Sequence, residues 1–267
     1  HPLVKKIAFT GGTEIAKSIA TSMAPFLKPA IWELGGKSAN LVFSDANMDN
    51  AVKYSARQPL FLAGQGCILP TRLLIEEDIA SEFIERLIAE VGSLMIGDPR
   101  NDETELGPVI SKSAQLRILD LIAKTEERGD GDLCYGGGFP ENVDPNGYFV
   151  EPTIFSNVKP NSIIAQNECF GPVIVSMTFK TEDEAIDIAN GTSFGLGAYI
   201  QSSNLSRCNR LVERLHAGGI FVNGAPTARE NAPFGGIEFS GFGREGGRDG
   251  IQEYIRIKNV GINTSDG

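Results

Sequence analysis

The sequence is poor in the residues that build metal sites and disulfide frameworks. It contains only two histidines, and its four cysteines are widely spaced and form no CxxC pair. A structural zinc site needs such ligands at close spacing, and disulfide-stabilised folds are far denser in cysteine. The sequence therefore disfavours both, and the free thiols favour a reducing, cytoplasmic compartment.

Long apolar runs and long basic runs are also absent. A membrane-spanning helix needs roughly 18 or more consecutive apolar residues, and broad nucleic-acid binding needs a basic face. The 24 basic and 34 acidic residues instead give a net charge of −10. We therefore expect neither a membrane nor a nucleic acid as a partner, and a small-molecule substrate remains compatible with the charge.

Strand-like and helix-like segments alternate along the 267 residues. Short apolar segments predict strands near residues 4–9, 31–34, 39–43, 71–76, 149–155, 173–179, 196–200 and 219–222. Helical periodicity or capping residues predict helices near residues 13–27, 49–61, 79–91, 111–127, 181–190 and 205–215. Such βαβ alternation predicts an α/β fold with an open, mainly parallel sheet and flanking helices.

The end of the chain shows a different pattern. After the glycine-rich stretch 233–247, apolar residues alternate over 251–262 as in a strand. An exposed edge strand is relieved when it pairs with another subunit. We therefore expect a homo-oligomer, as a dimer or a tetramer.

Cys67 is the first candidate for chemistry, because it follows the turn Gly64-Gln65-Gly66. Glycines leave backbone amides free to approach a ligand, and amides that face a sulfur favour the nucleophilic thiolate. The same amides can stabilise an oxyanion. A buried cysteine that acts only as a small hydrophobe is the competing interpretation, and it is the better one for the other three cysteines.

Glu33 is the second candidate. It ends the apolar segment Ala30-Ile31-Trp32 and precedes Leu34-Gly35-Gly36-Lys37. Burial of a carboxylate is costly, and it raises the carboxyl pKa towards the range of a general base. A solvated strand end, or a pair with Lys37, explains the same pattern without catalysis.

Two further stretches could bind a cofactor. Phe9-Thr10-Gly11-Gly12-Thr13 joins a strand to a helix start, where free amides can hold a phosphate. In Glu168-Cys169-Phe170-Gly171-Pro172, the carboxylate could hold a ribose and the aromatic ring could pack on a nicotinamide. Either stretch could also be an ordinary loop.

Together these stretches, with Pro233-Phe234-Gly235-Gly236, resemble the aldehyde dehydrogenase superfamily in order and spacing. The likeness runs from about residue 4 to residue 260. Connecting segments are similar as well, at 97–99, 107–111, 147–153 and 240–245.

The resemblance implies an NAD- or NADP-dependent oxidation of an aldehyde to a carboxylic acid. Cys67 would be the nucleophile that forms a thiohemiacetal and then a thioester, and Glu33 would activate the hydrolytic water. The cofactor would be held by five residues, namely Gly11, Gly12, Leu34, Glu168 and Phe170. Phe61, Leu62, Ile68 and the loop 224–232 would line the funnel through which the aldehyde enters.

The resemblance also implies a division of the chain. Residues 1–33 would be a remnant of the cofactor-binding domain, 34–232 the catalytic domain, and 233–267 a return segment with the oligomerisation strand. Roughly the first half of the family's chain has no counterpart here, so we expect a truncated chain that in isolation binds the cofactor poorly and oxidises aldehydes slowly or not at all. Ala16 and Leu62 stand where the family often has glycine and asparagine.

Two alternatives remain open from the sequence. A CoA-acylating semialdehyde dehydrogenase would transfer the acyl group to CoA and would not need the Glu33 base. A catalytically inactive scaffold would keep the fold and the oligomerisation strand without a reactive Cys67.

Overall fold

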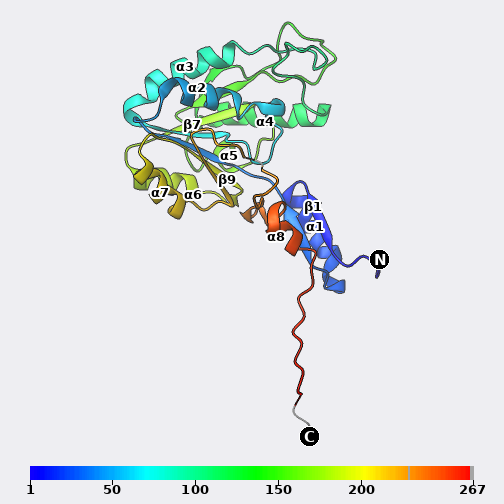
Figure 1. The fold of residues 1–267 in the computed structure, drawn as a ribbon. Coiled ribbons are helices and arrows are strands. Elements are labelled where there is room, and N and C mark those ends of the chain that lie inside the picture. The colour runs from blue at the N-terminus through cyan, green and yellow to red at the C-terminus, as the bar shows by residue number, and fades with distance from the viewer. Residues whose placement is uncertain (228, 265–267) are drawn as a thin grey trace.

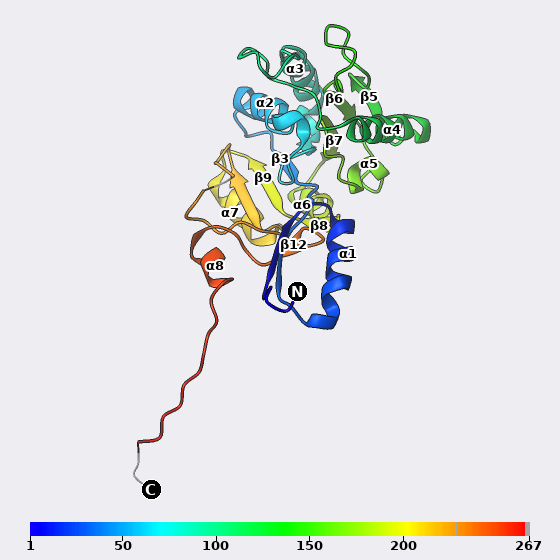
Figure 2. The same cartoon turned by 90° about the vertical axis from the view of Figure 1, so that its right-hand side faces the viewer.

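Two sheets of different size organise the chain in the computed structural model, which describes residues 1–227 and 229–264 (Figures 1 and 2). The larger sheet has seven strands in the order β10-β9-β3-β4-β7-β6-β5, and all neighbours are parallel except the β6–β5 pair. The mainly parallel α/β sheet is therefore confirmed. Its strands are β3 (Ala39–Val42), β4 (Arg72–Glu76), β5 (Asp132–Tyr135), β6 (Thr153–Ser156), β7 (Val173–Phe179), β9 (Gly197–Gln201) and β10 (Gly219–Val222).

Helices cover both faces of this sheet, as Figure 1 shows. On one side lie α2 (Met48–Arg57), α3 (Ala80–Gly92) and α4 (Lys112–Arg128), and on the other α6 (Glu182–Asn190) and α7 (Leu205–Arg214). The central strands are consequently buried on both faces: Leu41, Leu74 and Ile174 are each 0 % exposed. The short helix α5 (Ile163–Gln166) precedes β7.

Side chains cap the helices where the sequence predicts their starts. Ser111 accepts a hydrogen bond from the Ala114 amide, and Thr181 accepts one from the Glu184 amide. Thr181 and Glu184 have the spacing of a capping box, which forms only in part, since the Glu184 carboxylate accepts from the amide of Lys180 rather than from that of Thr181.

The smaller sheet joins the two ends of the chain. It contains β1 (Ile7–Thr10), β2 (Ala30–Glu33) and β12 (Gly241–Phe242), with α1 (Thr13–Met23) connecting the parallel pair β1–β2. Trp32 holds this unit together, because its ring meets Phe9 and Phe242 edge-on at centroid distances of 6.0 and 6.4 Å. A two-stranded ribbon of β8 (Phe194–Gly195) and β11 (Ile237–Glu238) lies beside it. The return segment is thereby anchored against β2, next to Glu33.

Two expectations about local structure need correction. Strand β5 pairs antiparallel with β6 and is absent from the predicted strands. The strand-like tail contains the short helix α8 (Gly247–Gln252), and residues 255–264 then run away from the body of the molecule without secondary structure (Figure 1). A strand requires ladder hydrogen bonds from a neighbouring strand, and in the described part of the chain no strand pairs with residues 255–264. Pairing of the tail with a second subunit stays a prediction, and residues 265–267 lie outside the described part.

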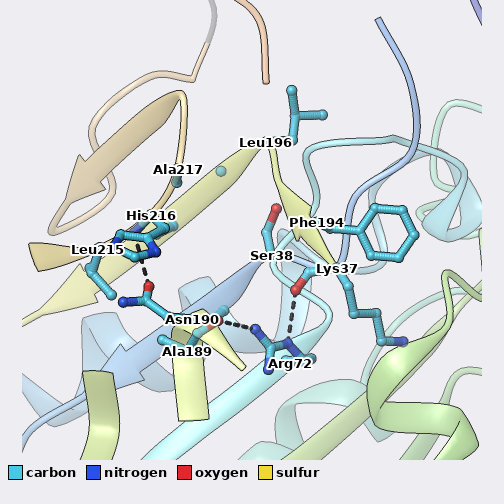
Figure 3. Close-up of a pocket in the computed structure, with 13 residues that line it drawn as sticks. Lys37, Ser38, Arg72, Ala189, Asn190, Phe194, Leu196, Leu215, His216 and Ala217 are labelled. Atoms are coloured by element: carbon cyan, nitrogen blue, oxygen red, sulfur yellow. Dashed lines mark hydrogen bonds between the residues drawn. The ribbon is translucent and has the colours of Figure 1, made fainter. Parts of the chain in front are cut away.

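Arg72 fixes the start of β4 to the turn that follows Glu33. Its side chain is 1 % exposed, and it donates to the carbonyl oxygens of Lys37 at 2.8 Å, Ile188 at 2.9 Å and Ala189 at 2.6 Å. Figure 3 shows this guanidinium beside Lys37 and Ser38, next to a cavity of about 10 Å³. That volume is close to the minimum for one water molecule. Three carbonyls matched to one planar cation form a rigid support beneath the turn.

Replacement of Arg72 should therefore destabilise the fold. Arg72→Lys offers a point charge that cannot reach all three carbonyls, so we expect a loss of about 2–4 kcal/mol in the free energy of unfolding. Urea denaturation would measure it. Arg86→Lys is the matched control, because Arg86 pairs with the exposed carboxylates of Asp49 and Glu82, and the unfolding midpoint should not change measurably. Equal losses in both variants would contradict the supporting role of Arg72.

Candidate active site

The turn Leu34-Gly35-Gly36 is the point at which the predicted site residues meet. The Gly36 amide donates to Glu168 Oε1 at 3.0 Å. A Cβ atom at Gly36 would lie 2.3 Å from the carbonyl oxygen of Cys67, and one at Gly35 would lie 2.5 Å from Glu168 Oε2. At Gly36 the contact is with a backbone atom, so no other residue type fits there, whereas a side chain at Gly35 would push the Glu168 carboxylate away. The glycines thus allow Cys67 and Glu168 to approach the end of β2.

The segment before Cys67 is held in an unusual conformation. Leu62, Ala63 and Gly64 have φ angles of 52°, 54° and 71°, all in the left-handed region, which costs energy at the two residues with a Cβ atom. Gly64 packs so closely on Gly171 that an added Cβ would lie 2.0 Å from its carbonyl oxygen. The loop is thus fixed against the turn that carries Glu168.

Cys67 is half-buried, and the pKa of its thiol is raised. Burial is the largest cause, followed by the negative charge of Glu168, while the backbone amides of Cys67 and Ile68 lower the pKa. The expected amides therefore face the sulfur, but burial and two nearby carboxylates, Glu168 and Glu33, outweigh their effect on the pKa. A base that removes the thiol proton would therefore have to assist the formation of the thiolate.

Glu33 is a buried carboxyl group without a hydrogen-bond partner among the described residues. It is 2 % exposed, and both of its carboxylate oxygens are unpaired. Burial, followed by the charge of Glu245, raises its pKa to about 7, while Arg244 lowers it. The explanation of Glu33 as a solvated strand end or a Lys37 partner is thus not supported, and its pKa suits a general base near neutral pH.

The return segment closes this site from the other side. A Cβ atom at Gly235 would lie 2.8 Å from Glu33 Oε1, so the backbone there touches the carboxylate. Arg244 is held beside it by donating to the carbonyl oxygens of Gly236 at 2.9 Å and Gly243 at 2.7 Å. The sequence did not single out Arg244 and Glu245 as neighbours of Glu33, since their proximity arises only from the pairing of β12 with β2.

The comparisons with known proteins agree with this geometry. A family model described as the aldehyde dehydrogenase family matches residues 1–260. The chain belongs to the aldehyde dehydrogenase family. Betaine aldehyde dehydrogenase of Amaranthus hypochondriacus is 43 % identical over 99 % of this chain, and aminoaldehyde dehydrogenase 1 of Pisum sativum is 40 % identical over 100 % of it. The chain spans about half the length of these relatives, 52 % in both cases.

Solved structures of the family share the fold. Betaine aldehyde dehydrogenase of Staphylococcus aureus, crystallised with NAD+, superposes with a TM-score of 0.92 at 34 % identity, over 95 % of this chain and 50 % of that one. An aldehyde dehydrogenase of Mycobacterium tuberculosis in complex with NAD+ gives a TM-score of 0.95 at 32 % identity, over 100 % and 55 %.

The expected cytoplasmic location is wrong. The curated plant relatives are named chloroplastic or peroxisomal proteins. Free thiols report only on redox conditions, which do not distinguish one reducing compartment from another. Among the described residues no helix is long and apolar enough to cross a membrane.

The residues expected to hold a cofactor attach to the same turn. The Gly11 amide donates to the Glu33 carbonyl oxygen at 3.0 Å, and Gly12 begins α1 without a side-chain cap, so the first amides of the helix remain free. Glu168 contacts the other side of the turn, and Phe170 next to it is exposed. The placement fits a dinucleotide, with helix amides for a phosphate and a carboxylate for ribose hydroxyls. Leu34 instead packs with Trp32 in the small core.

A cavity of about 170 Å³ lies beside the two catalytic candidates. Ile68 and part of the loop 224–232, which we expect to line the aldehyde funnel, line this cavity, and Phe234 lines it as well. Phe61 and Leu62 do not line this cavity and are exposed.

The remaining cysteines form no second site. Cys169 and Cys208 are buried, and Cys134 is half-buried with its sulfur 2.9 Å from the Ser156 hydroxyl. Within the described part of the chain no group of histidine, cysteine and acidic side chains could hold a metal ion.

Removal of the Glu33 charge should stabilise the protein, and more so at higher pH. Folding raises the carboxyl pKa of Glu33 from 4.5 to about 7. Below pH 4.5 the group is protonated in both states, so the free energy of unfolding is unaffected. As the pH rises from 4.5 to 7 the unfolded state ionises first, and the folded state becomes progressively less stable relative to it. Glu33→Gln should therefore unfold at a similar urea concentration at pH 4.5 but should be about 1–3 kcal/mol more stable at pH 8. Glu14→Gln on the exposed face of α1 serves as the control and should show no such difference. A gain of equal size at both pH values would argue against the raised pKa.

Proposed function

We propose that this protein, as part of an aldehyde dehydrogenase, oxidises an aldehyde to a carboxylic acid with NAD or NADP as the hydride acceptor. One observation carries the proposal: a single glycine turn brings a thiol, an unpaired buried carboxyl group and the expected ribose ligand together. The NAD+ complexes of related structures support the choice of cofactor.

Cys67 is the proposed nucleophile. Its sulfur attacks the aldehyde carbon after the thiol loses its proton, and the carbonyl oxygen becomes an oxyanion. The amides of Cys67 and Ile68, which already face the sulfur, are in place to stabilise that charge. A nicotinamide held beside Cys67 would accept the hydride from the thiohemiacetal carbon, and Cys67 would then carry the acyl group as a thioester.

Glu33 is the proposed general base for hydrolysis. In its ionised form it takes a proton from water, whose oxygen attacks the thioester carbon, and the carboxylic acid and the Cys67 thiol are released. The net reaction consumes one aldehyde, one water and one oxidised cofactor, and it yields the acid, the reduced cofactor and a proton. Gly11, Gly12, Glu168 and Phe170 would hold the cofactor along the same turn, whereas the packing of Leu34 points to a supporting role.

The buried Glu33 carboxyl also argues against the CoA-acylating enzyme and against the inactive scaffold. A CoA-acylating enzyme needs no base at this position, so an isolated carboxyl with a pKa of about 7 favours water as the acyl acceptor. An inactive scaffold would gain stability by replacing that carboxyl, yet this chain keeps it. We also retain the three-part division at residues 33 and 232, and subunit pairing through the tail, as proposals.

Replacement of Cys67 tests the nucleophile directly. Cys67→Ala should reduce hydrolysis of p-nitrophenyl acetate by about 10³-fold or more, because the acyl-enzyme can no longer form. Cys134→Ala, at another half-buried thiol, should leave the rate unchanged. Release of p-nitrophenol would be followed by absorbance. Retained hydrolysis in Cys67→Ala would rule out this cysteine as the nucleophile.

The pH dependence of deacylation tests the base. Once Cys67 is acylated, the hydrolysis rate should rise with pH as Glu33 loses its proton near pH 7 and should level off above about pH 8. In Glu33→Gln the profile should lose this step, and the rate should fall by about 10²–10⁴-fold. Single-turnover mass spectrometry of the acyl-enzyme measures both. Addition of CoA should not accelerate the step, and a large acceleration would favour the CoA-acylating alternative.

A further inference from the structure

The funnel cavity touches the neighbours of both catalytic candidates. Ile68, the residue after Cys67, lines one side, and Gly235, whose backbone abuts the Glu33 carboxylate, lines the other. A molecule with its carbonyl group at Cys67 would therefore extend its remaining atoms into this space. The residues of the cavity wall consequently select the far end of the substrate.

The side chains of that wall differ in polarity and charge. Glycines and apolar side chains such as Ile220, Phe221 and Phe234 make up most of it. Among the described residues that line it, Arg229 is the single ionisable one. Arg229 thus adds one guanidinium to a wall whose other residues are mostly glycines and apolar groups.

Arg229 is also free to bind a ligand. Among the described residues its side chain makes no hydrogen bond and no ion pair, whereas the neighbouring Arg244 is held by two carbonyl oxygens. Glu230, next in the chain, does not line the cavity. A guanidinium without a partner beside an apolar pocket matches a carboxylate, which it can bind through two parallel hydrogen bonds.

We propose that Arg229 determines specificity by binding an anionic group, so that the preferred substrate is an aldehyde with a carboxylate at its far end. This inference rests on the proposed function of Cys67. This preference would distinguish the chain from its relatives that are named for betaine aldehyde and for aminoaldehydes. Those aldehydes carry a positively charged nitrogen, which Arg229 would repel.

Protection of Cys67 from alkylation tests the inference without any cofactor. An aldehyde that forms the thiohemiacetal blocks the sulfur, so the rate of iodoacetamide labelling reports its binding. Three four-carbon aldehydes would be compared: 4-oxobutanoate, its uncharged amide, and 4-trimethylammoniobutanal. The concentration for half-protection should be about tenfold lower for the carboxylate than for the amide, and highest for the cation.

Variants connect the preference to one side chain. Arg229→Gln should remove the advantage of 4-oxobutanoate over the amide, and added salt should weaken it in the unaltered protein. Arg256→Gln, which removes an exposed arginine of the tail that does not line the cavity, should keep the preference.

The outcomes separate the inference from the proposed function. Equal protection by all three aldehydes, or a carboxylate preference that survives in Arg229→Gln, would overturn the role of Arg229 while leaving Cys67 as the nucleophile. If iodoacetamide labels Cys67 and no aldehyde protects it, the proposed function fails and the inference fails with it.

Discussion

The close contact between the Gly35-Gly36 backbone and its two neighbours is the constraint on which the site depends. Any side chain there would meet the Cys67 carbonyl oxygen or the Glu168 carboxylate at less than contact distance. Because both glycines lack a Cβ atom, the end of one sheet can touch a loop from the other. Arg72 stabilises this arrangement by donating hydrogen bonds to three carbonyl oxygens, one of which belongs to Lys37 at the end of the turn.

That contact sets the electrostatics of the site. Two carboxyl groups and a thiol lie in one poorly solvated region, so burial raises the pKa of all three. Lys37 lies in the same region with its ammonium group buried and unpaired among the described residues, and burial lowers its pKa to about 8. Glu33 and Lys37 are thereby moved towards pKa values at which a small change of surroundings alters their charge, whereas the Cys67 thiol becomes harder to ionise.

Much of the fold could be predicted from the sequence because its signals are local. Strand β7 and strand β10 were placed at their observed bounds, and the start of α4 follows from Ser111. The sequence failed where structure depends on a distant partner. Strand β5 carries little apolar alternation and exists through its pairing with β6, while the tail alternates like a strand but pairs with no strand among the described residues.

The sequence by itself determined which residues could react: a cysteine after a glycine turn, a glutamate at a strand end, and the motifs whose order resembles one enzyme family. Only the tertiary structure decided how they behave. Among the described residues it left the Glu33 carboxyl without a partner, made the Cys67 thiol harder to ionise, and set Arg229 at the wall of the cavity that Ile68 and Gly235 also line. The physical reason is that burial and charge–charge distance are properties of packing, and packing joins segments that lie far apart in the chain.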